Sequence, residues 1–334
     1  MSFSDHCNPH VGLNIIYRGF DDTSDLPLLQ HLLEMSDAAD GKTSLSIEYL
    51  TKFCQSTERF TPSRDLQIAY LENSDGKLLP IGFSKLSWYS GFDNAKLLYQ
   101  LSFLLKEYRA QGIWPIIVRH NELHLRTIAA SLENSKTMLL QAWSTDTEKD
   151  WMATLKNENY EIVREFNNMI HPMDSIPDIP LPVGFEIRPV EKSHFRPIWE
   201  AQREMNAGLF ENIAEDWTED TFPAWVENAK ITSSCWQVAW ADNEPAGMVL
   251  AHYDPKNNPK HGYTEHIFVY PKWRNRGLAS ALIVKSLHTL HAHGVEKAEL
   301  GVDAQNENAA FSLYKKLGYT TISIDTWFRK PLNQ

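Results

Sequence analysis

One stretch, a strand followed by a small-residue loop and a helix, constrains the fold more than any other part of the sequence. Residues 265–270 are rich in β-branched and aromatic side chains and predict a strand, which Pro271 ends. Residues 280–284 then open a helix. The first N–H groups of a helix lack internal partners and lie at the positive end of its dipole. Because Gly277 and Ala279 leave room for a phosphate, the stretch predicts an anion site.

The spacing of this loop is Arg-x-x-Gly-x-Ala, from Arg274 to Ala279. It is neither the dinucleotide motif Gly-x-Gly-x-x-Gly nor a P-loop, because no Gly-Lys-Ser/Thr follows. Further along the chain stand Asn306 and Tyr-Lys-Lys-Leu-Gly-Tyr at 314–319. Together the two elements resemble the signatures of the GNAT N-acetyltransferase superfamily. The alternative is a generic βαβ unit whose turn is small.

Length and composition limit the possible classes of protein. A chain of 334 residues predicts two domains, and 43% hydrophobic with 22% charged residues is typical of soluble globular proteins. No apolar run is long enough to span a membrane, and the N-terminus does not read as a signal peptide. Three scattered cysteines predict a reducing, cytoplasmic location without a disulfide framework. A net charge of −11 argues against nucleic acid as the main partner.

The sequence divides at a stretch with four prolines, residues 172–184. Proline fixes φ and removes a donor, so residues 174–184 predict an extended linker between domains 1–173 and 185–334. Strands are expected just after each domain begins, at 13–18 and 185–190.

A weak internal repeat relates the two halves. Residues 108–114 parallel 273–279, and 155–163 parallel 314–322. The fold expected from the resemblance is mixed α/β (α+β): two tandem GNAT-like domains, each with a twisted, mainly antiparallel sheet flanked by helices. The tandem arrangement is similar to that of mycothiol synthase and its relatives.

The first half departs from the superfamily pattern at three chemical positions. Trp114 stands where the superfamily has Gly or Ala, and an indole there would fill the space of a pyrophosphate. Leu155 stands opposite Tyr314, and Thr147 stands opposite Asn306. The first domain is therefore expected to be a degenerate scaffold, with acetyl-CoA bound by the second domain alone.

The resemblance implies that the strand before the loop bonds the pantetheine amides across a splay, with Leu300-Gly301-Val302 as the partner strand. The loop would hold the pyrophosphate through its backbone N–H groups, with added positive charge from arginines that could equally be solvated. The implied acetyl-CoA contacts are Ile267, Phe268, Val269, Arg274, Asn275, Arg276, Gly277, Leu278 and Ala279.

Tyr314 matches the general acid of the superfamily. A phenol has the wrong ordinary pKa for a base at neutral pH but can give a proton to a departing thiolate. The alternative is a tyrosine that packs a helix against the sheet. Asn306 precedes a helical run, so it is expected first as an N-cap and second as a residue near acetyl-CoA.

Glu265 is the candidate general base, directly or through water; the alternative is a solvated carboxylate at a strand end. Strand alternation predicts Glu265, Ile267 and Val269 on one face and His266 on the other. His266 is the rival base by residue type. His261 falls in a Pro/Asn/Lys-rich stretch and is expected to be solvated.

The acceptor is expected to be a primary amine on a small molecule, acetylated by direct attack and without a metal. Acidic residues between the first strand and the next helices could attract a cationic amine or form a solvated run: Glu211, Glu215, Asp216, Glu219 and Asp220. A non-catalytic acyl-CoA sensor and a protein N-terminal or lysine acetyltransferase are the alternative functions. The sequence leaves the acceptor, acyl length and oligomeric state open.

Overall fold

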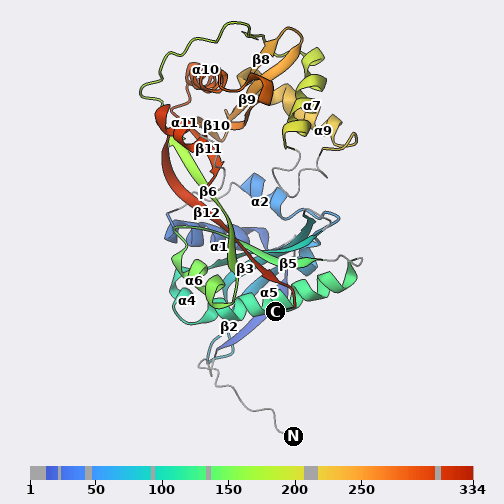
Figure 1. Cartoon of the computed structure of the whole chain (residues 1–334). Helices are drawn as coiled ribbons and strands as arrows, with labels where there is room; N and C mark the ends of the chain where they lie inside the picture. Colours follow the sequence, from blue (N-terminus) through green and yellow to red (C-terminus); the bar gives the residue numbers. More distant parts are fainter. Residues whose placement is uncertain are drawn as a thin grey trace. The chain divides into compact units, whose positions relative to one another are not determined.

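The computed structural model describes residues 13–21, 24–41, 47–91, 95–132, 137–206, 217–304 and 310–333 (Figure 1). The chain forms two compact units. Unit 1 comprises Met1–Val163 with Thr326–Gln334, and unit 2 comprises Arg164–Asp325. None of the helices in the described part of the chain is long and apolar enough to cross a membrane.

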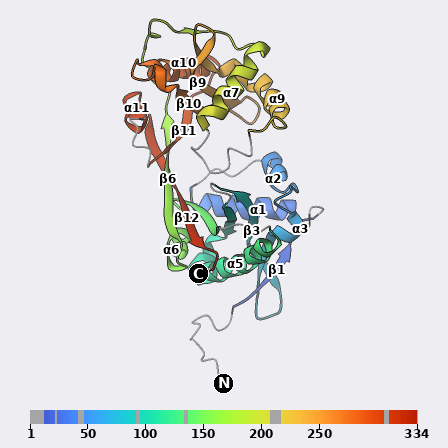
Figure 2. The ribbon, with the colours of Figure 1, turned by 45° about the vertical axis from the view of Figure 1, so that its right-hand side comes forward.

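Unit 1 is a sheet with helices on both faces. Its elements are β1 (Asn14–Gly19), α1 (Leu26–Ala39), α2 (Ile47–Phe53), α3 (Pro62–Asp65), β2 (Leu66–Glu72), β3 (Leu78–Ser90), β4 (Lys96–Leu104), α4 (Lys106–Arg109), α5 (Ile113–Ser131), β5 (Met138–Thr145), α6 (Lys149–Asn157) and the start of β6 (Glu161–His171). The strand order is β1-β2-β3-β4-β5 and then β12, and of the first five only β4 and β5 pair in parallel. One core lies under α5 and another under α1 and α2. Figure 2 labels these three helices.

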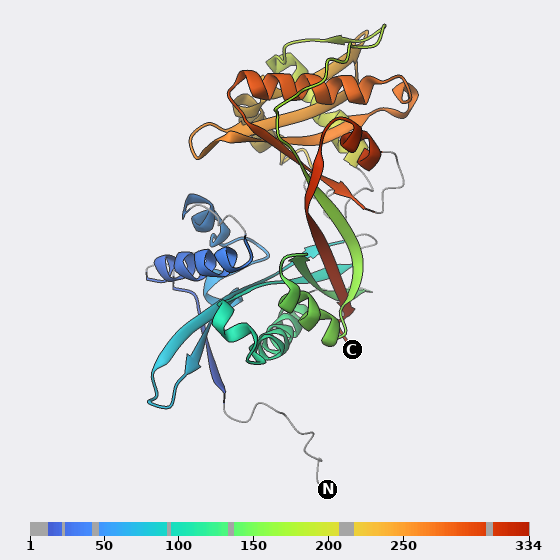
Figure 3. The ribbon, with the colours of Figure 1, turned by 90° about the vertical axis from the view of Figure 1, so that its left-hand side faces the viewer.

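Unit 2 repeats this order of elements. They are β7 (Glu186–Ile187), η2 (Lys192–His194), α7 (Phe195–Asn206), α9 (Phe222–Thr232), η3 (Ser233–Cys235), β8 (Gln237–Ala241), β9 (Glu244–Asp254), β10 (Asn258–Val269), η4 (Pro271–Trp273), α10 (Leu278–Ala292), β11 (Lys297–Asp303), α11 (Ala310–Lys316) and β12 (Thr320–Pro331). The strand order is β6-β11-β10-β9-β8-β7, with β10 and β11 parallel. The orange helix α10 lies across one face (Figure 3), and α7 and α9 cover the other. The predicted mixed α/β fold with mainly antiparallel sheets is confirmed.

The two units use the same close contact between neighbouring strands. Gly82 pairs with Leu104 and Gly247 pairs with Val269. A Cβ at Gly82 would lie 2.2 Å from the Phe103 carbonyl oxygen, and one at Gly247 would lie 2.8 Å from the Phe268 carbonyl oxygen. Both positions require glycine because the adjacent backbone occupies the space of a side chain.

Two long strands run from one unit into the other. Residues 164–171 of β6 lie in unit 2, whereas residues 326–331 of β12 lie in unit 1. The unit bounds therefore differ from the predicted domain limits of 1–173 and 185–334. Residues 174–184, predicted as a linker, contain no helix or strand and lie within unit 2, where Ile176, Ile179 and Leu181 pack on the core under α10.

Candidate active site

The loop between β10 and α10 leaves an open helix N-terminus. Gly277 caps α10 in the left-handed conformation, with φ 81°, and residues 274–277 are exposed. A Cβ built on Gly277 would meet nothing within 4 Å. The first N–H groups of α10 have no partner within the helix and lie at its positive end. The loop therefore offers space, donors and positive potential to an anion.

Two arginine side chains of the loop contact the loop itself and the end of β10. Arg274 Nε donates to the Val269 carbonyl at 3.0 Å, which ties the loop back to the end of β10. The Arg276 guanidinium lies over the Trp273 ring, 5.0 Å from its centroid. Asn275 has a left-handed φ of 60°, and Leu278 is buried in the core under α10, which Ala279 borders. Leu278 can therefore offer a ligand only its backbone.

Strands β10 and β11 separate part-way along their length. Their pairing runs from His261↔Lys297 to Tyr263↔Glu299 and goes no further, although both strands are fully described. Leu300-Gly301-Val302 instead pair with β6 on their other edge. The edge of Ile267-Phe268-Val269 that would face β11 is therefore left open to a ligand with amide groups.

A β-bulge interrupts β10 beside this opening. Glu265 pairs with Leu250 and Phe268 pairs with Met248, so one extra residue lies on β10, and His266 has a φ of 47°. Ile267 packs on the α10 core, whereas Leu250, the partner of Glu265, belongs to the core under α7 and α9. The predicted common face for Glu265, Ile267 and Val269 is wrong, because a bulge shifts the alternation by one residue.

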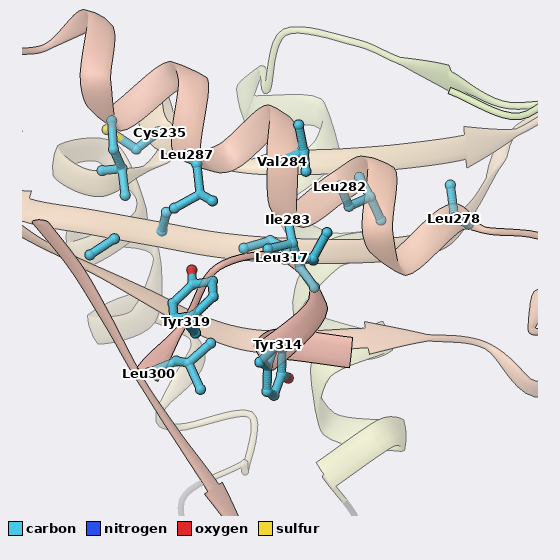
Figure 4. Close-up of a cluster of buried hydrophobic side chains, with 14 of the residues drawn as sticks. Cys235, Leu278, Leu282, Ile283, Val284, Leu287, Leu300, Tyr314, Leu317 and Tyr319 are labelled. Carbon is cyan, nitrogen blue, oxygen red and sulfur yellow. The ribbon is translucent and has the colours of Figure 1, made fainter. Parts of the chain in front are cut away.

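Tyr314 lies on α11 with 7% of its surface exposed, within the core under α10. Its ring packs edge-on against Tyr319, with centroids 5.9 Å apart, and the two hydroxyls point in different directions (Figure 4). Burial raises the pKa of Tyr314 to about 12. The phenol is therefore protonated at neutral pH, as a proton donor must be, and it also fills part of the core.

Glu265 belongs to a titratable cluster on the α7 side of the sheet. Half of its side chain is exposed, and its Oε2 lies 3.9 Å from His252 Nδ1. The Tyr263 ring stacks on both His252 and His261, at centroid distances of 5.2 and 4.8 Å. His261 Nε2 lies 2.9 Å from Glu299 Oε2. The cluster stands where the pairing of β10 with β11 ends.

Sequence reasoning missed most of this cluster. His261 lies within β10 and is 9% exposed, so the prediction of a solvated loop histidine is wrong. The alternation of His261, Tyr263 and Glu265 was a readable signal that they share a face. His252 and Glu299 come from neighbouring strands, and only the register of those strands brings them together.

Asn306, Glu211, Glu215 and Asp216 lie outside the described residues. Glu219 is described and pairs with Arg196 at 2.8 Å. Within the described ranges, no group of three or more His, Cys, Asp or Glu side chains is arranged to hold a metal ion.

A cavity of about 640 Å³ lies beside the end of β10, against α7. Its carboxylates have cationic or hydroxyl partners: Glu204 accepts a hydrogen bond from Tyr270, Glu244 pairs with Lys272 and Glu200 pairs with Arg196. Each of these carboxylates is therefore already bonded, and the lining does not include Glu265 or Tyr314.

Unit 1 keeps the same loop but closes it. Gly112 caps α5 with φ 73°, and Arg109 Nε donates to the Leu104 carbonyl at 2.9 Å, as Arg274 does to Val269. The Arg109 guanidinium, however, forms a buried ion pair with Asp40 at 2.6 Å. Trp114 is 4% exposed and packs on Trp151 at a centroid distance of 4.7 Å.

In unit 1 the parallel pairing of β4 with β5 likewise stops, after Gln100↔Ala142, but the counterparts of Glu265 and Tyr314 there are apolar. Strand β4 pairs with β3 in unbroken register from Gly82↔Leu104 to Ser90↔Lys96, so it has no bulge. Lys85 lies three residues after Gly82, as Leu250 lies three residues after Gly247. Leu101, the partner of Lys85, therefore takes the place that Glu265, the partner of Leu250, has in β10. Leu155 takes the place of Tyr314 and is fully buried.

Comparisons with known proteins find relatives of this chain. Residues 197–319 match the acetyltransferase (GNAT) family. The mycothiol acetyltransferase of Nocardiopsis dassonvillei is 25% identical over 227 residues, which cover 58% of this chain and 65% of that protein. The chain thus spans slightly less than two thirds of this relative's length.

Two solved structures share the fold over nearly the whole chain. A GCN5-related N-acetyltransferase from Sphaerobacter thermophilus aligns with a TM-score of 0.72 and 18% identity, over 95% of this chain and 96% of that one. A tandem GNAT protein from the clavulanic acid biosynthesis pathway aligns with a TM-score of 0.66 and 13% identity, over 96% and 99%.

These matches define the class of protein. The chain carries a domain of the GNAT acetyltransferase family at residues 197–319, within a fold shared with tandem GNAT proteins. The predicted resemblance to this superfamily is confirmed. The family match and the mycothiol acetyltransferase relatives support an acyltransferase.

The raised pKa of Tyr314 gives a direct test of its surroundings. Folding favours the protonated phenol, so this contribution to stability is complete below pH 10 and is lost as pH rises through about 12. We expect the difference in tyrosinate absorbance between wild type and Tyr314→Phe to titrate near pH 12. A difference centred at the ordinary value of about 10 would show that the phenol is solvated.

Proposed function

We propose that the chain is an N-acetyltransferase in which unit 2 binds acetyl-CoA and transfers its acetyl group to a primary amine of a small molecule. The observation that carries this proposal is the opening between β10 and β11, which leads into the exposed N-terminus of α10. An open strand edge suits the amides of pantetheine, and a free helix N-terminus suits a pyrophosphate.

The residues present fit acetyl-CoA. The space beside Gly277 is open, and a side chain there would intrude on it. The backbone of residues 274–279 would hold the pyrophosphate, with Arg274 and Arg276 adding charge, and that of Ile267, Phe268 and Val269 would bond the pantetheine. From the sequence, Asn306 is also proposed to lie near acetyl-CoA. Bound acetyl-CoA supplies the acetyl thioester, and no metal is required.

The chain's own groups supply the remaining chemistry. A backbone N–H beside the bulge polarises the thioester carbonyl, because bulges re-aim backbone groups. Glu265 accepts the proton of the attacking amine, with His252 close by. Tyr314, kept protonated by its raised pKa, donates a proton to the departing thiolate. Direct attack by the amine therefore needs no covalent enzyme intermediate.

The titratable cluster favours a cationic acceptor. Glu265 and Glu299 give the mouth of the opening negative charge, and an acidic mouth attracts an amine that arrives protonated.

Two buried cysteines, Cys54 and Cys235, are free thiols, which supports the proposed cytoplasmic location.

Unit 1 is proposed to be a scaffold that binds no acetyl-CoA. Its arginine is already neutralised by Asp40, and Trp114 occupies the space that Ala279 leaves in unit 2. Because the polar residues are lost only in unit 1, retention of Glu265 and Tyr314 in unit 2 favours an enzyme over an acyl-CoA sensor.

Binding should occur at one site per chain. We expect calorimetric titration with acetyl-CoA to give a stoichiometry of one. Ala279→Trp should abolish binding, because it copies the indole of unit 1 into the pyrophosphate loop. The matched control, Trp114→Ala, should leave affinity unchanged. Two equivalent sites per chain would contradict the proposed role of unit 1.

Turnover tests the function itself. We expect thiol release from acetyl-CoA with at least one member of a panel of polyamines, aminoglycosides and amino acids. Tyr314→Phe should lower kcat on the order of 100-fold with acetyl-CoA affinity unchanged, because the lost proton transfer occurs in the transition state. Binding without turnover of any amine would favour a sensor, and turnover of peptides alone would favour protein acetylation.

Glu265→Gln should reduce activity mainly at low pH. A protonated amine cannot attack, so the loss of a proton acceptor is felt most where the amine is charged. The measurement is the pH dependence of kcat/KM, with His266→Asn as the neighbouring control. An acidic limb that is the same in Glu265→Gln and wild type would exclude this carboxylate as the base.

A further inference from the structure

His171 ends β6, yet it lies in unit 2 and is 1% exposed. Its Nδ1 accepts a hydrogen bond from the Met173 N–H at 3.0 Å. Its other nitrogen bonds the Leu317 carbonyl. Both ring nitrogens are therefore used, which defines one tautomer with the proton on Nε2. Burial lowers the pKa of His171 and keeps the ring neutral.

The Leu317 carbonyl belongs to the end of the helix that carries Tyr314. The Tyr319 N–H donates to the Tyr314 carbonyl and the Gly318 N–H donates to Lys315, which forms a Schellman motif. Gly318 has a φ of 97°, and a Cβ there would lie 2.9 Å from His171 Nε2. The glycine of the signature thus makes room for the histidine ring.

A row of aromatic contacts continues from His171 to the phenol. The His171 and Tyr319 rings pack edge-on with their centroids 5.2 Å apart, and the Tyr319 and Tyr314 rings pack with theirs 5.9 Å apart. Figure 4 shows Tyr319 and Tyr314 side by side. The Tyr319 hydroxyl also bonds Thr264 Oγ1 at 3.0 Å, one residue before Glu265. The ring of Tyr314 is therefore fixed relative to β10 through Tyr319.

Unit 1 holds a matching contact with different chemistry. Lys330 of β12 corresponds to His171 of β6, because the separation from Tyr319 to Lys330 equals the separation from Tyr160 to His171. Its Nζ donates to the Glu158 carbonyl at 3.0 Å and lies 5.2 Å from the centre of the Tyr160 ring. In each unit a strand from the other half of the sequence thus holds a helix end, but the helix of unit 1 carries Leu155 in place of Tyr314.

We propose that His171 is a positioning residue for Tyr314: it fixes the end of α11 and the Tyr319 ring so that the phenol is aimed at the departing sulfur. This inference rests on the proposed function. It means that the first half of the chain contributes a residue to the active site of the second.

A double-mutant cycle on the full chain tests this role. His171→Phe keeps a ring but removes both hydrogen bonds, and we expect kcat to fall about tenfold, the equivalent of one hydrogen bond. The KM for acetyl-CoA should stay within about twofold, because the loop and β10 are untouched. His171→Gln, which can still donate to Leu317, should recover part of kcat and carries the test if His171→Phe does not fold.

The outcomes separate the two proposals. If His171 acts through Tyr314, His171→Phe should have little further effect on kcat in Tyr314→Phe. If His171→Phe lowers kcat equally in wild type and in Tyr314→Phe, the positioning role alone is overturned. If Tyr314→Phe has a normal kcat, both the role of Tyr314 as the acid and the inference about His171 are overturned. Lys330→Met is the control in unit 1, where it also breaks the buried ion pair with Glu122. It should lower the melting temperature and spare kcat, and an equal loss of kcat there would reduce His171 to a structural residue.

Discussion

The separation of β10 from β11 is the constraint on which the rest of unit 2 depends. Parallel pairing stops after Tyr263↔Glu299, and one extra residue at the bulge turns the next backbone groups out of register. Exposed strand edges are normally covered or paired. Here the edge of β10 beyond Tyr263 has no strand partner on the β11 side, while β11 continues to pair with β6 as far as Asp303. The opening therefore lies where β10 and β11 part.

The two units show how one framework can keep or lose a binding site. The glycine contacts, the left-handed cap and the arginine that ties the loop to its strand are the same in both. Unit 1 fills the remaining space with Trp114 and neutralises its guanidinium with Asp40. A buried ion pair is costly to break, since either partner alone would be left charged in the core. In unit 1 the loop residues Arg109 and Trp114 are therefore held in the packed interior, whereas in unit 2 the loop around Arg274 is exposed.

The exchange of β6 and β12 links the two halves chemically. Each strand carries, at or next to its last residue, a side chain that bonds a helix-end carbonyl: His171 bonds Leu317, and Lys330 bonds Glu158. Such carbonyls have no partner within their helix, so a donor from elsewhere stabilises the helix end. In unit 2 that helix carries Tyr314. In the proposed mechanism, the first half of the chain therefore supports the chemistry of the second half through His171.

The sequence by itself determined the features that depend on local spacing. The strand, loop and helix around Gly277, the mixed α/β class and the resemblance to GNAT acetyltransferases were all readable, because small residues and capping positions act over a few residues. The face of Glu265 was predicted wrongly, and His252, Glu299 and His171 were missed. A bulge appears only when two strands are aligned, and a residue more than 140 positions away reaches Leu317 only through the exchange of strands. Register and strand exchange are properties of the whole sheet, so only the tertiary structure decided them.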